Sequence, residues 1–197
     1  MRNVKNIHPL WLRLCHWINA VAILIMVTSG FRIYNASPLF NFQFPKEITL
    51  GGWLGGALQW HFAGMWLFTI NGLIYLLFNL FSGRFKRRFF PLSLSGLFRE
   101  ILAAIRGKLL HENIKDYNMI QKAAYLFVTI DSLLLVASGL VVWKSVQFSL
   151  LRELMGGYET ARLIHFYAMS AIVCFVVIHL LMVMLVPRTL LAMIRGR

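Results

Sequence analysis

Four long apolar runs constrain the fold of this 197-residue chain more than any other feature. They cover residues 14–31, 57–81, 123–143 and 163–186. A helix needs about 20 mostly apolar residues to cross a bilayer, and it satisfies its own backbone hydrogen bonds, as lipid requires. The runs are continuous rather than alternating, which excludes the strands of a β-barrel. The sequence therefore predicts an all-α integral membrane protein, a four-transmembrane-helix bundle that forms a single domain over residues 1–197.

Composition supports this class and argues against others. Hydrophobic residues make up 59% of the chain and charged residues 14%, which leaves little room for a soluble domain. A net charge of +13 would also suit a nucleic-acid-binding protein. However, most of the 20 lysines and arginines lie before the first run, between the second and third runs, or after the fourth. Membrane topology explains that distribution, so we expect lipid rather than nucleic acid around the chain.

The same basic segments predict the orientation of the chain. With four spans, all three segments fall on one side of the membrane, and the positive-inside rule makes that side cytoplasmic. We therefore expect a multi-pass membrane protein with both termini in the cytoplasm. In the long cytoplasmic loop, apolar residues recur at helical spacing between positions 97 and 109. This pattern predicts an interfacial amphipathic helix, either bound to headgroups or acting only as a connector.

Four histidines stand at the ends of the apolar runs. His165 and His179 are fourteen residues apart in the last run, and fourteen steps bring a helix back to nearly the same face about 21 Å further along. His16 opens the first run and His61 stands near the start of the second. Because successive spans alternate in direction, His61 and His165 should lie near the outer side, and His16 and His179 near the cytoplasm. The sequence therefore predicts two histidine pairs at two depths.

Iron coordination explains all four histidines together. A lone intramembrane histidine is more often a packing residue or part of a proton relay, but a polar ring in lipid needs a compensating partner. Neutral imidazole binds iron well, and neither pair has a carboxylate that would suit a free metal ion. The chain has two cysteines and no Cys-x-x-Cys-His motif. We therefore predict two non-covalent b haems, each held by two histidines.

Small residues on the histidine faces support this prediction. A porphyrin between helices needs room, and Gly30 follows His16 by fourteen residues, on nearly the same face. Gly72 follows His61 by eleven residues, again on nearly the same face. Gly30 is expected near the outer haem and Gly72 near the cytoplasmic one. Close helix packing is the alternative explanation for either glycine.

Basic residues near the ends of the runs are candidates for the haem propionates. Arg13 and Lys86 would serve the cytoplasmic-side haem, and Arg32 and Arg162 the outer one. Anchoring to lipid headgroups is the simpler role for each of them. Asp131 is the only acid within a run, and bonding to a neighbour, a protonated state and a proton path all remain open for it.

Several motifs together resemble a known family. They are His8-Pro9-Leu10-Trp11 through His16-Trp17, Gln59-Trp60-His61, Tyr117-Asn118 to Gln121, and the His165/His179 pair. Over nearly its whole length the chain resembles the prokaryotic di-haem cytochromes b. These are membrane anchor subunits of hydrogenases, formate dehydrogenases and thiosulfate reductases, and the thiosulfate-reductase type is the most similar.

The resemblance implies an electron-transfer role in the bacterial inner (cytoplasmic) membrane. His61 and His165 would hold the haem nearer a periplasmic redox enzyme subunit, a molybdopterin enzyme or similar oxidoreductase, and His16 and His179 the haem nearer the cytoplasm. Electrons would pass between that partner and the quinone pool, menaquinone or ubiquinone. In relatives the quinone site lies beside the cytoplasmic-side haem. The polar residues matching that region are His111, Asn113, Tyr117, Asn118 and Gln121, with Tyr117 and Asn118 preferred, although helix capping explains this pair equally well.

Two other functional classes remain open. The first is a self-contained quinone oxidoreductase that acts on a small periplasmic substrate such as superoxide. The second is a transporter or assembly factor without a cofactor, whose histidines transfer protons. A non-catalytic electron-transfer subunit is the interpretation that accounts for all four histidines.

Overall fold

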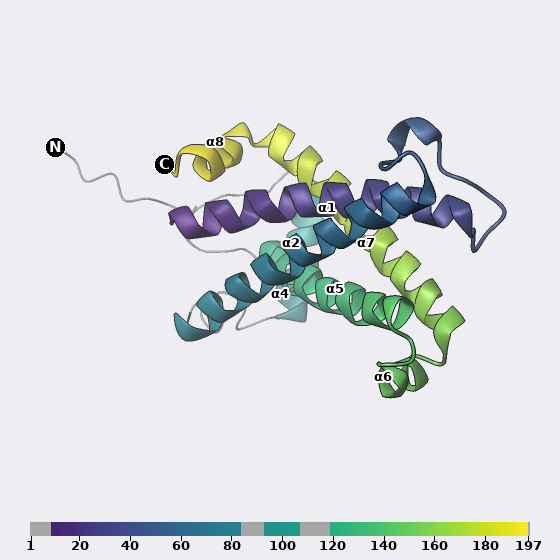
Figure 1. Cartoon of the computed structure of the whole chain (residues 1–197). Helices are drawn as coiled ribbons and strands as arrows, with labels where there is room; N and C mark the ends of the chain where they lie inside the picture. Colours follow the sequence, from purple (N-terminus) through teal and green to yellow (C-terminus); the bar gives the residue numbers. More distant parts are fainter. Residues whose placement is uncertain (1–8, 84–92, 107–118, 197) are drawn as a thin grey trace. The chain divides into compact units, whose positions relative to one another are not determined.

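The computed structural model describes residues 9–83, 93–106 and 119–196 (Figure 1). Every regular element among them is a helix, which confirms the predicted all-α class. In chain order the elements are α1 (Leu10–Ala36), the short 3-10 helix η1 (Lys46–Ile48), α2 (Leu54–Phe81), α4 (Leu94–Ile105), α5 (Met119–Trp143), α6 (Ser149–Leu154), α7 (Tyr158–Leu185) and α8 (Pro187–Arg195). They form two compact units, one of Met1–Leu77 with Val176–Arg197 and the other of Phe78–Phe175.

The helices α1, α2, α5 and α7 are long and apolar enough to span a membrane, which confirms the four predicted spans. Each contains or nearly contains its predicted apolar run and extends further, because polar and aromatic flanking residues stay helical beyond the hydrocarbon. The fourth span ends at Leu185, and the next helix, α8, begins two residues later at Pro187. Proline lacks an N–H and clashes with the preceding turn, so it starts a helix more readily than it continues one.

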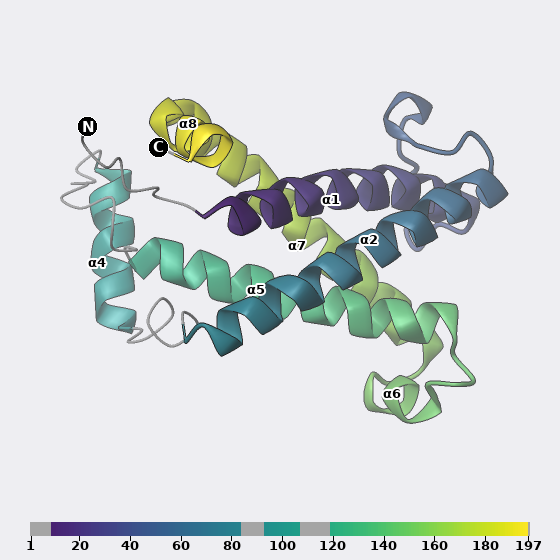
Figure 2. The ribbon, with the colours of Figure 1, turned by 60° about the vertical axis from the view of Figure 1, so that its left-hand side comes forward.

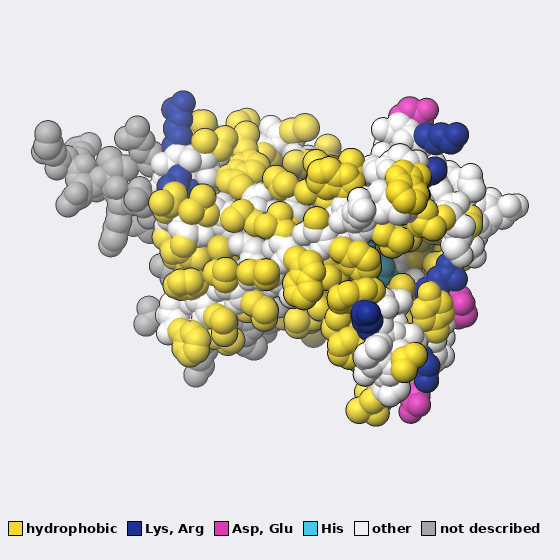
Figure 3. All heavy atoms as spheres, viewed as in Figure 1, with side chains coloured by type: hydrophobic (Ala, Val, Ile, Leu, Met, Phe, Trp, Pro, Cys, Tyr) yellow, Lys and Arg dark blue, Asp and Glu magenta, His cyan; other side chains and the backbone are white. Residues whose placement is uncertain are grey.

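The surfaces of the long helices are apolar. Between 11% and 22% of the most apolar window of each span is buried inside the protein. Hydrophobic side chains cover the long helices in Figure 3, whereas charged side chains lie near helix ends and on the connections. Apolar surface on this scale needs a non-aqueous environment, as expected of a multi-pass membrane protein.

In the first unit, α1 and α2 are joined by close packing and by one polar contact. A Cβ added at Gly64 would lie 2.8 Å from Met26 Cγ, so this approach requires glycine. The Asn71 side chain, which is 6% exposed, donates from Nδ2 to the Cys15 carbonyl at 2.8 Å and to Asn19 Oδ1 at 2.7 Å. These bonds tie the middle of α2 to the turn of α1 that carries His16.

The connection between α1 and α2 folds back on the end of α1 through an aromatic cluster. The Phe31 and Phe44 rings stack with centroids 3.9 Å apart, and Tyr34 contacts both Phe42 and Phe44. The Asn35 amide donates to the Phe44 carbonyl and accepts from the Phe44 N–H, both at 2.8 Å. This aromatic-rich connection is therefore an ordered cap on its own helix.

The C-terminal helix α8 belongs to the same unit and lies beside the start of α1 (Figure 2). Arg13 Nη1 donates to the Ile194 carbonyl at 2.7 Å, and Trp17 Nε1 contacts the Met193 carbonyl at 3.5 Å. Gly196 ends the helix with φ +79°, a left-handed conformation that favours glycine. Arg13 thus caps the negative end of α8.

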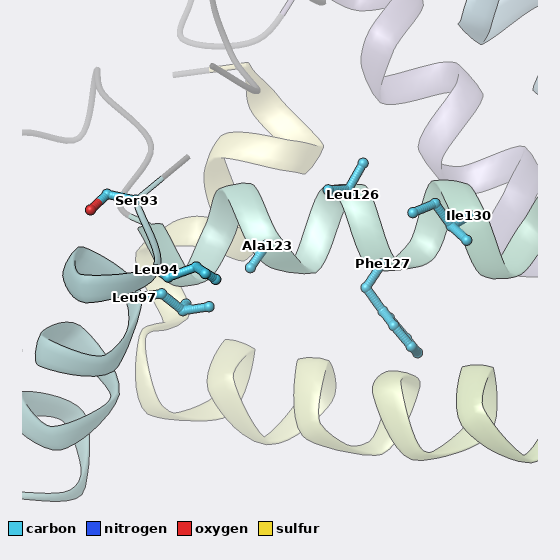
Figure 4. A pocket seen from close by; sticks show the side chains of 7 residues that line it. All are labelled: Ser93, Leu94, Leu97, Ala123, Leu126, Phe127 and Ile130. Carbon is cyan, nitrogen blue, oxygen red and sulfur yellow. The ribbon is translucent and has the colours of Figure 1, made fainter. Parts of the chain in front are cut away.

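In the second unit, α4 is the predicted amphipathic helix and packs against the start of α5. Glu100 Oε2 accepts a hydrogen bond from the Ile120 N–H at 3.1 Å, which satisfies an unpaired donor of the first turn of α5. A cavity of about 270 Å³ lies between the two helices. It is lined by Ser93, Leu94, Leu97, Ala123, Leu126, Phe127 and Ile130 (Figure 4).

Candidate functional site

His16 and His179 lie side by side within the first unit. His16 is on the first turns of α1 and His179 near the end of α7, and their ring centroids are 6.1 Å apart with an interplanar angle of 64°. This is the pair that span direction predicted for the cytoplasmic side, and 163 positions of sequence separate its members.

The separation of the two rings fits a shared iron. When two imidazoles bind one iron from opposite sides, each through a metal–nitrogen bond of about 2 Å, their ring centroids lie roughly 6 Å apart. Simple ring packing also falls in this range. His179 is exposed on α7, so a ligand can reach its ring. The donors present at this pair therefore fit a b haem.

Arg13 provides a second indication at the same end of α1, three residues before His16. Its Nη1 caps α8, but its Nε is buried and has no hydrogen-bond partner among the described residues. A buried guanidinium N–H without an acceptor is costly, and a propionate carboxylate is the acceptor it pairs with best. Gly72 on α2 has open space at its Cβ position, with no atom within 4 Å.

His61 is held through its Nδ1 atom by α1. Nδ1 lies 3.1 Å from Ser29 Oγ and 3.1 Å from the Met26 carbonyl oxygen. A carbonyl can only accept, so Nδ1 carries the proton and the lone pair of the ring is on Nε2. A Cβ at Gly30 would lie 3.6 Å from His61 Cε1. Gly30 therefore faces a histidine at the level that the sequence predicted.

In the second unit His165 is held in the same way by α5. Its Nδ1 lies 3.0 Å from Ser138 Oγ, and a Cβ at Gly139 would lie 3.2 Å from its Cε1. Ser138 is completely buried. Ser29, Ser138 and Gly139 were not among the predicted site residues, although a Ser-Gly pair occurs in both the first and the third apolar run and could have indicated them.

Adding a methyl group at Gly139 should disturb His165. A Cβ at 3.2 Å is tighter than ordinary van der Waals contact, so in Gly139→Ala the imidazole must shift by a few tenths of an ångström. Gly30→Ala, at the equivalent glycine beside His61, places its Cβ at an ordinary 3.6 Å from that ring and serves for comparison. We expect a larger change in the optical and EPR spectra of bound haem for Gly139→Ala than for Gly30→Ala. Equal spectra for both variants would contradict the crowding.

Other predicted site residues have different surroundings. Arg162 donates to Glu159 Oε2 at 3.0 Å within the first turns of α7. Asp131 is 6% exposed, and its Oδ2 has no partner in the part of the chain that the structure describes. The hydroxyl of Thr129, two residues earlier on the same helix, donates to the Tyr125 carbonyl at 2.8 Å. The predicted residues Lys86, His111, Asn113, Tyr117 and Asn118 lie outside the described residues.

The number of protein ligands distinguishes a site for a free metal ion from a haem site. Within residues 9–83, 93–106 and 119–196 no three side chains of His, Cys, Asp or Glu come together as a metal site. A protein site for a free metal ion usually supplies three or four ligands, whereas a porphyrin supplies four nitrogens and leaves two positions for histidine. The two-histidine arrangement at His16 and His179 fits the second kind.

Comparison with known proteins agrees with this chemistry. A family model described as prokaryotic cytochrome b561 matches residues 7–196. A protein of Azospira oryzae (strain ATCC BAA-33 / DSM 13638 / PS), named putative protein-methionine-sulfoxide reductase subunit YedZ1, is 62% identical over 195 residues, covering 99% of this chain and 98% of its own. Together with the four spanning helices, these matches show that the chain belongs to the prokaryotic cytochrome b561 family, whose members use b haem for electron transfer in the membrane.

Proposed function

We propose that this protein is a membrane electron conduit with two non-covalent, bis-histidine b haems, linking a periplasmic redox enzyme subunit to the quinone pool. The observation that carries the proposal is the 6.1 Å separation of the His16 and His179 rings. When bound, each b haem supplies a one-electron Fe(III)/Fe(II) couple. The protein itself binds, orients and insulates these groups.

Four imidazoles would hold the two haems in this proposal. His16 and His179 form one pair, and His61 and His165 form the other, with Nε2 as the binding atom of His61 because its Nδ1 is protonated. With two imidazoles on each iron, no position is open for oxygen or substrate, so outer-sphere electron transfer is favoured. The two levels follow from α7, which carries His165 and His179 about 21 Å apart along one helix.

Surrounding residues complete the two sites. Arg13 Nε, buried without a partner among the described residues, would bind a propionate at the His16/His179 level. Arg162 is the proposed propionate partner at the outer level, where it would have to share its guanidinium with Glu159. Gly30 and Gly72 leave room for the porphyrin planes.

The similar Azospira oryzae protein supports a specific kind of partner. That protein is named as a subunit of a putative protein-methionine-sulfoxide reductase, and the identity extends over almost all of both chains. We infer that the partner here reduces methionine sulfoxide in proteins. Reducing a sulfoxide to a thioether and water takes two electrons, which one quinol supplies through the haems, and two protons, which come from the water around the partner. Electrons would therefore flow from quinol through the haems to the partner.

The quinone is proposed to bind on the cytoplasmic side, near the start of α5. Tyr117 and Asn118 immediately precede Met119, the first residue of that helix. A phenol and an amide offer the donors that a quinone carbonyl oxygen requires. Both termini are proposed to lie on this same side, and residues 1–197 to form a single domain.

Counting haem in the purified protein tests the proposal. We expect two b haems per chain in a pyridine haemochrome assay, both reducible by quinol, with onward transfer only when the partner enzyme is added. One haem or none would contradict the proposed sites. Turnover of superoxide by the chain alone would favour a self-contained oxidoreductase, and a haem-free protein would favour a transporter or assembly factor.

A further inference from the structure

We propose that Ser29 and Ser138 are matched positioning residues that set the orientation and the donor strength of His61 and His165, and thereby lower the reduction potential of the haem that these histidines bind. This inference rests on the proposed function, because it takes both histidines as axial ligands of one iron. Nothing in the family match or in the similar protein's name assigns a role to either serine.

The hydrogen-bond pattern determines which atom donates. Ser29 Oγ donates to the Ile25 carbonyl at 2.6 Å, and Ser138 Oγ donates to the Leu134 carbonyl at 2.6 Å. Each hydroxyl has only one proton, and when that proton is on the short 2.6 Å bond to the carbonyl, the oxygen accepts from the histidine beside it. The Nδ1–H of His61 therefore donates to Ser29 at 3.1 Å, and the Nδ1–H of His165 to Ser138 at 3.0 Å.

Both serines present the same fixed acceptor to an imidazole. Each is completely buried, and its bond to the carbonyl four residues earlier holds the hydroxyl against its own helix. In both cases the next residue is glycine, Gly30 or Gly139, and the histidine ring lies over it. The hydroxyl thus holds one edge of the ring, and the missing side chain leaves room for the ring itself.

This arrangement has an electronic consequence. A histidine whose outer N–H is hydrogen-bonded becomes a more basic ligand, with its tautomer and ring plane fixed. A more basic ligand stabilises the ferric state over the ferrous state and so lowers the potential. When both histidines of one haem are hydrogen-bonded in this way, both bonds lower the reduction potential of that haem. The haem at the outer level would then be a better reductant for the partner enzyme.

The test compares Ser29→Ala, Ser138→Ala and the double variant with Thr28→Val and Thr129→Val. The two threonines are matched controls on α1 and α5, because each makes the same bond to the carbonyl four residues earlier, at 2.8 Å, from a half-buried position. All variants would be purified as full chains and loaded with haem. The measurements are haem per chain, a potentiometric titration, and the EPR spectrum of the low-spin ferric haems.

We expect both alanine variants to keep two haems and to raise the potential of the same one. The change per serine should be about two- to tenfold in the equilibrium constant for reduction, the size of one net hydrogen bond, with the two changes adding in the double variant. In Ser29→Ala the Met26 carbonyl still accepts from His61, so Nδ1 stays protonated. The EPR g values of that haem should also move, because the ring planes are less constrained.

The possible failures are distinct. Two haems with potentials and g values equal to those of the threonine controls would overturn the inference and leave the proposed function standing. Shifts of two different haems by the two serines would overturn the joint action on one iron, and with it the pairing of His61 with His165. A protein without bound haem would overturn the proposed function itself, and the inference with it.

Discussion

Replacing His16 with alanine should remove one b haem and leave the other in place. His16 and His179 face each other at 6.1 Å within one unit, whereas His61 is held by Ser29 and Met26 on the other part of α1. Loss of one of two axial ligands typically costs most of the site's affinity, so we expect about half of the total haem to be lost, given four ligands shared by two irons. His179→Ala should lose the same haem. Pyridine haemochrome assays and the EPR signals of the remaining haem measure both results.

The control for this prediction is Cys174→Ala. Cys174 is exposed on α7, five residues before His179, and its replacement should leave both haems bound. If His16→Ala and His179→Ala removed different haems, the pairing would be wrong. If either variant removed both haems equally, the two sites would not be independent, and a single site would be the better description.

Asn71→Leu should lower the stability of the helix pair and loosen the haem site beside it. The side chain donates to the Cys15 carbonyl and to Asn19 Oδ1 from a buried position. Hydrogen bonds between membrane helices contribute less than burial suggests, so we expect a loss of roughly 1–2 kcal/mol in the free energy of unfolding for the two bonds together. Because Cys15 precedes His16, haem should also dissociate faster from the His16/His179 site. Titration with SDS, followed by circular dichroism and haem absorbance, measures both effects.

A double-mutant cycle with Asn19→Ala isolates the contact between the two amides. We expect the effects of Asn71→Leu and Asn19→Ala to be non-additive, since each removes one partner of the same 2.7 Å bond. Strict additivity would show that this bond contributes nothing to stability. In that case the loss would come from the Cys15 contact or from packing alone.

Some site residues were predictable from the sequence and others were not. The pairing of His16 with His179 followed from counting spans, because the direction of each helix assigns a depth to each end. Ser138 and Gly139 were missed, because single serines and glycines are common in membrane helices and packing alone explains them. Arg13 was expected either to bind a propionate or to anchor to lipid headgroups. The structure adds a cap on α8, which hydropathy cannot indicate because it depends on where a distant helix ends.

Hydropathy and charge were thus sufficient for the four spans and the helical class. These follow from the thickness of the bilayer and from the need of every backbone group in lipid for a hydrogen bond. The contacts of individual side chains depended on how the helices pack. Residues as far apart in sequence as Cys15 and Asn71, or Ser138 and His165, meet only when two helices adopt one rotation and one close approach. The pattern of apolar residues does not determine the rotation of a helix or how closely it approaches its neighbour, because most positions of each span are equally apolar.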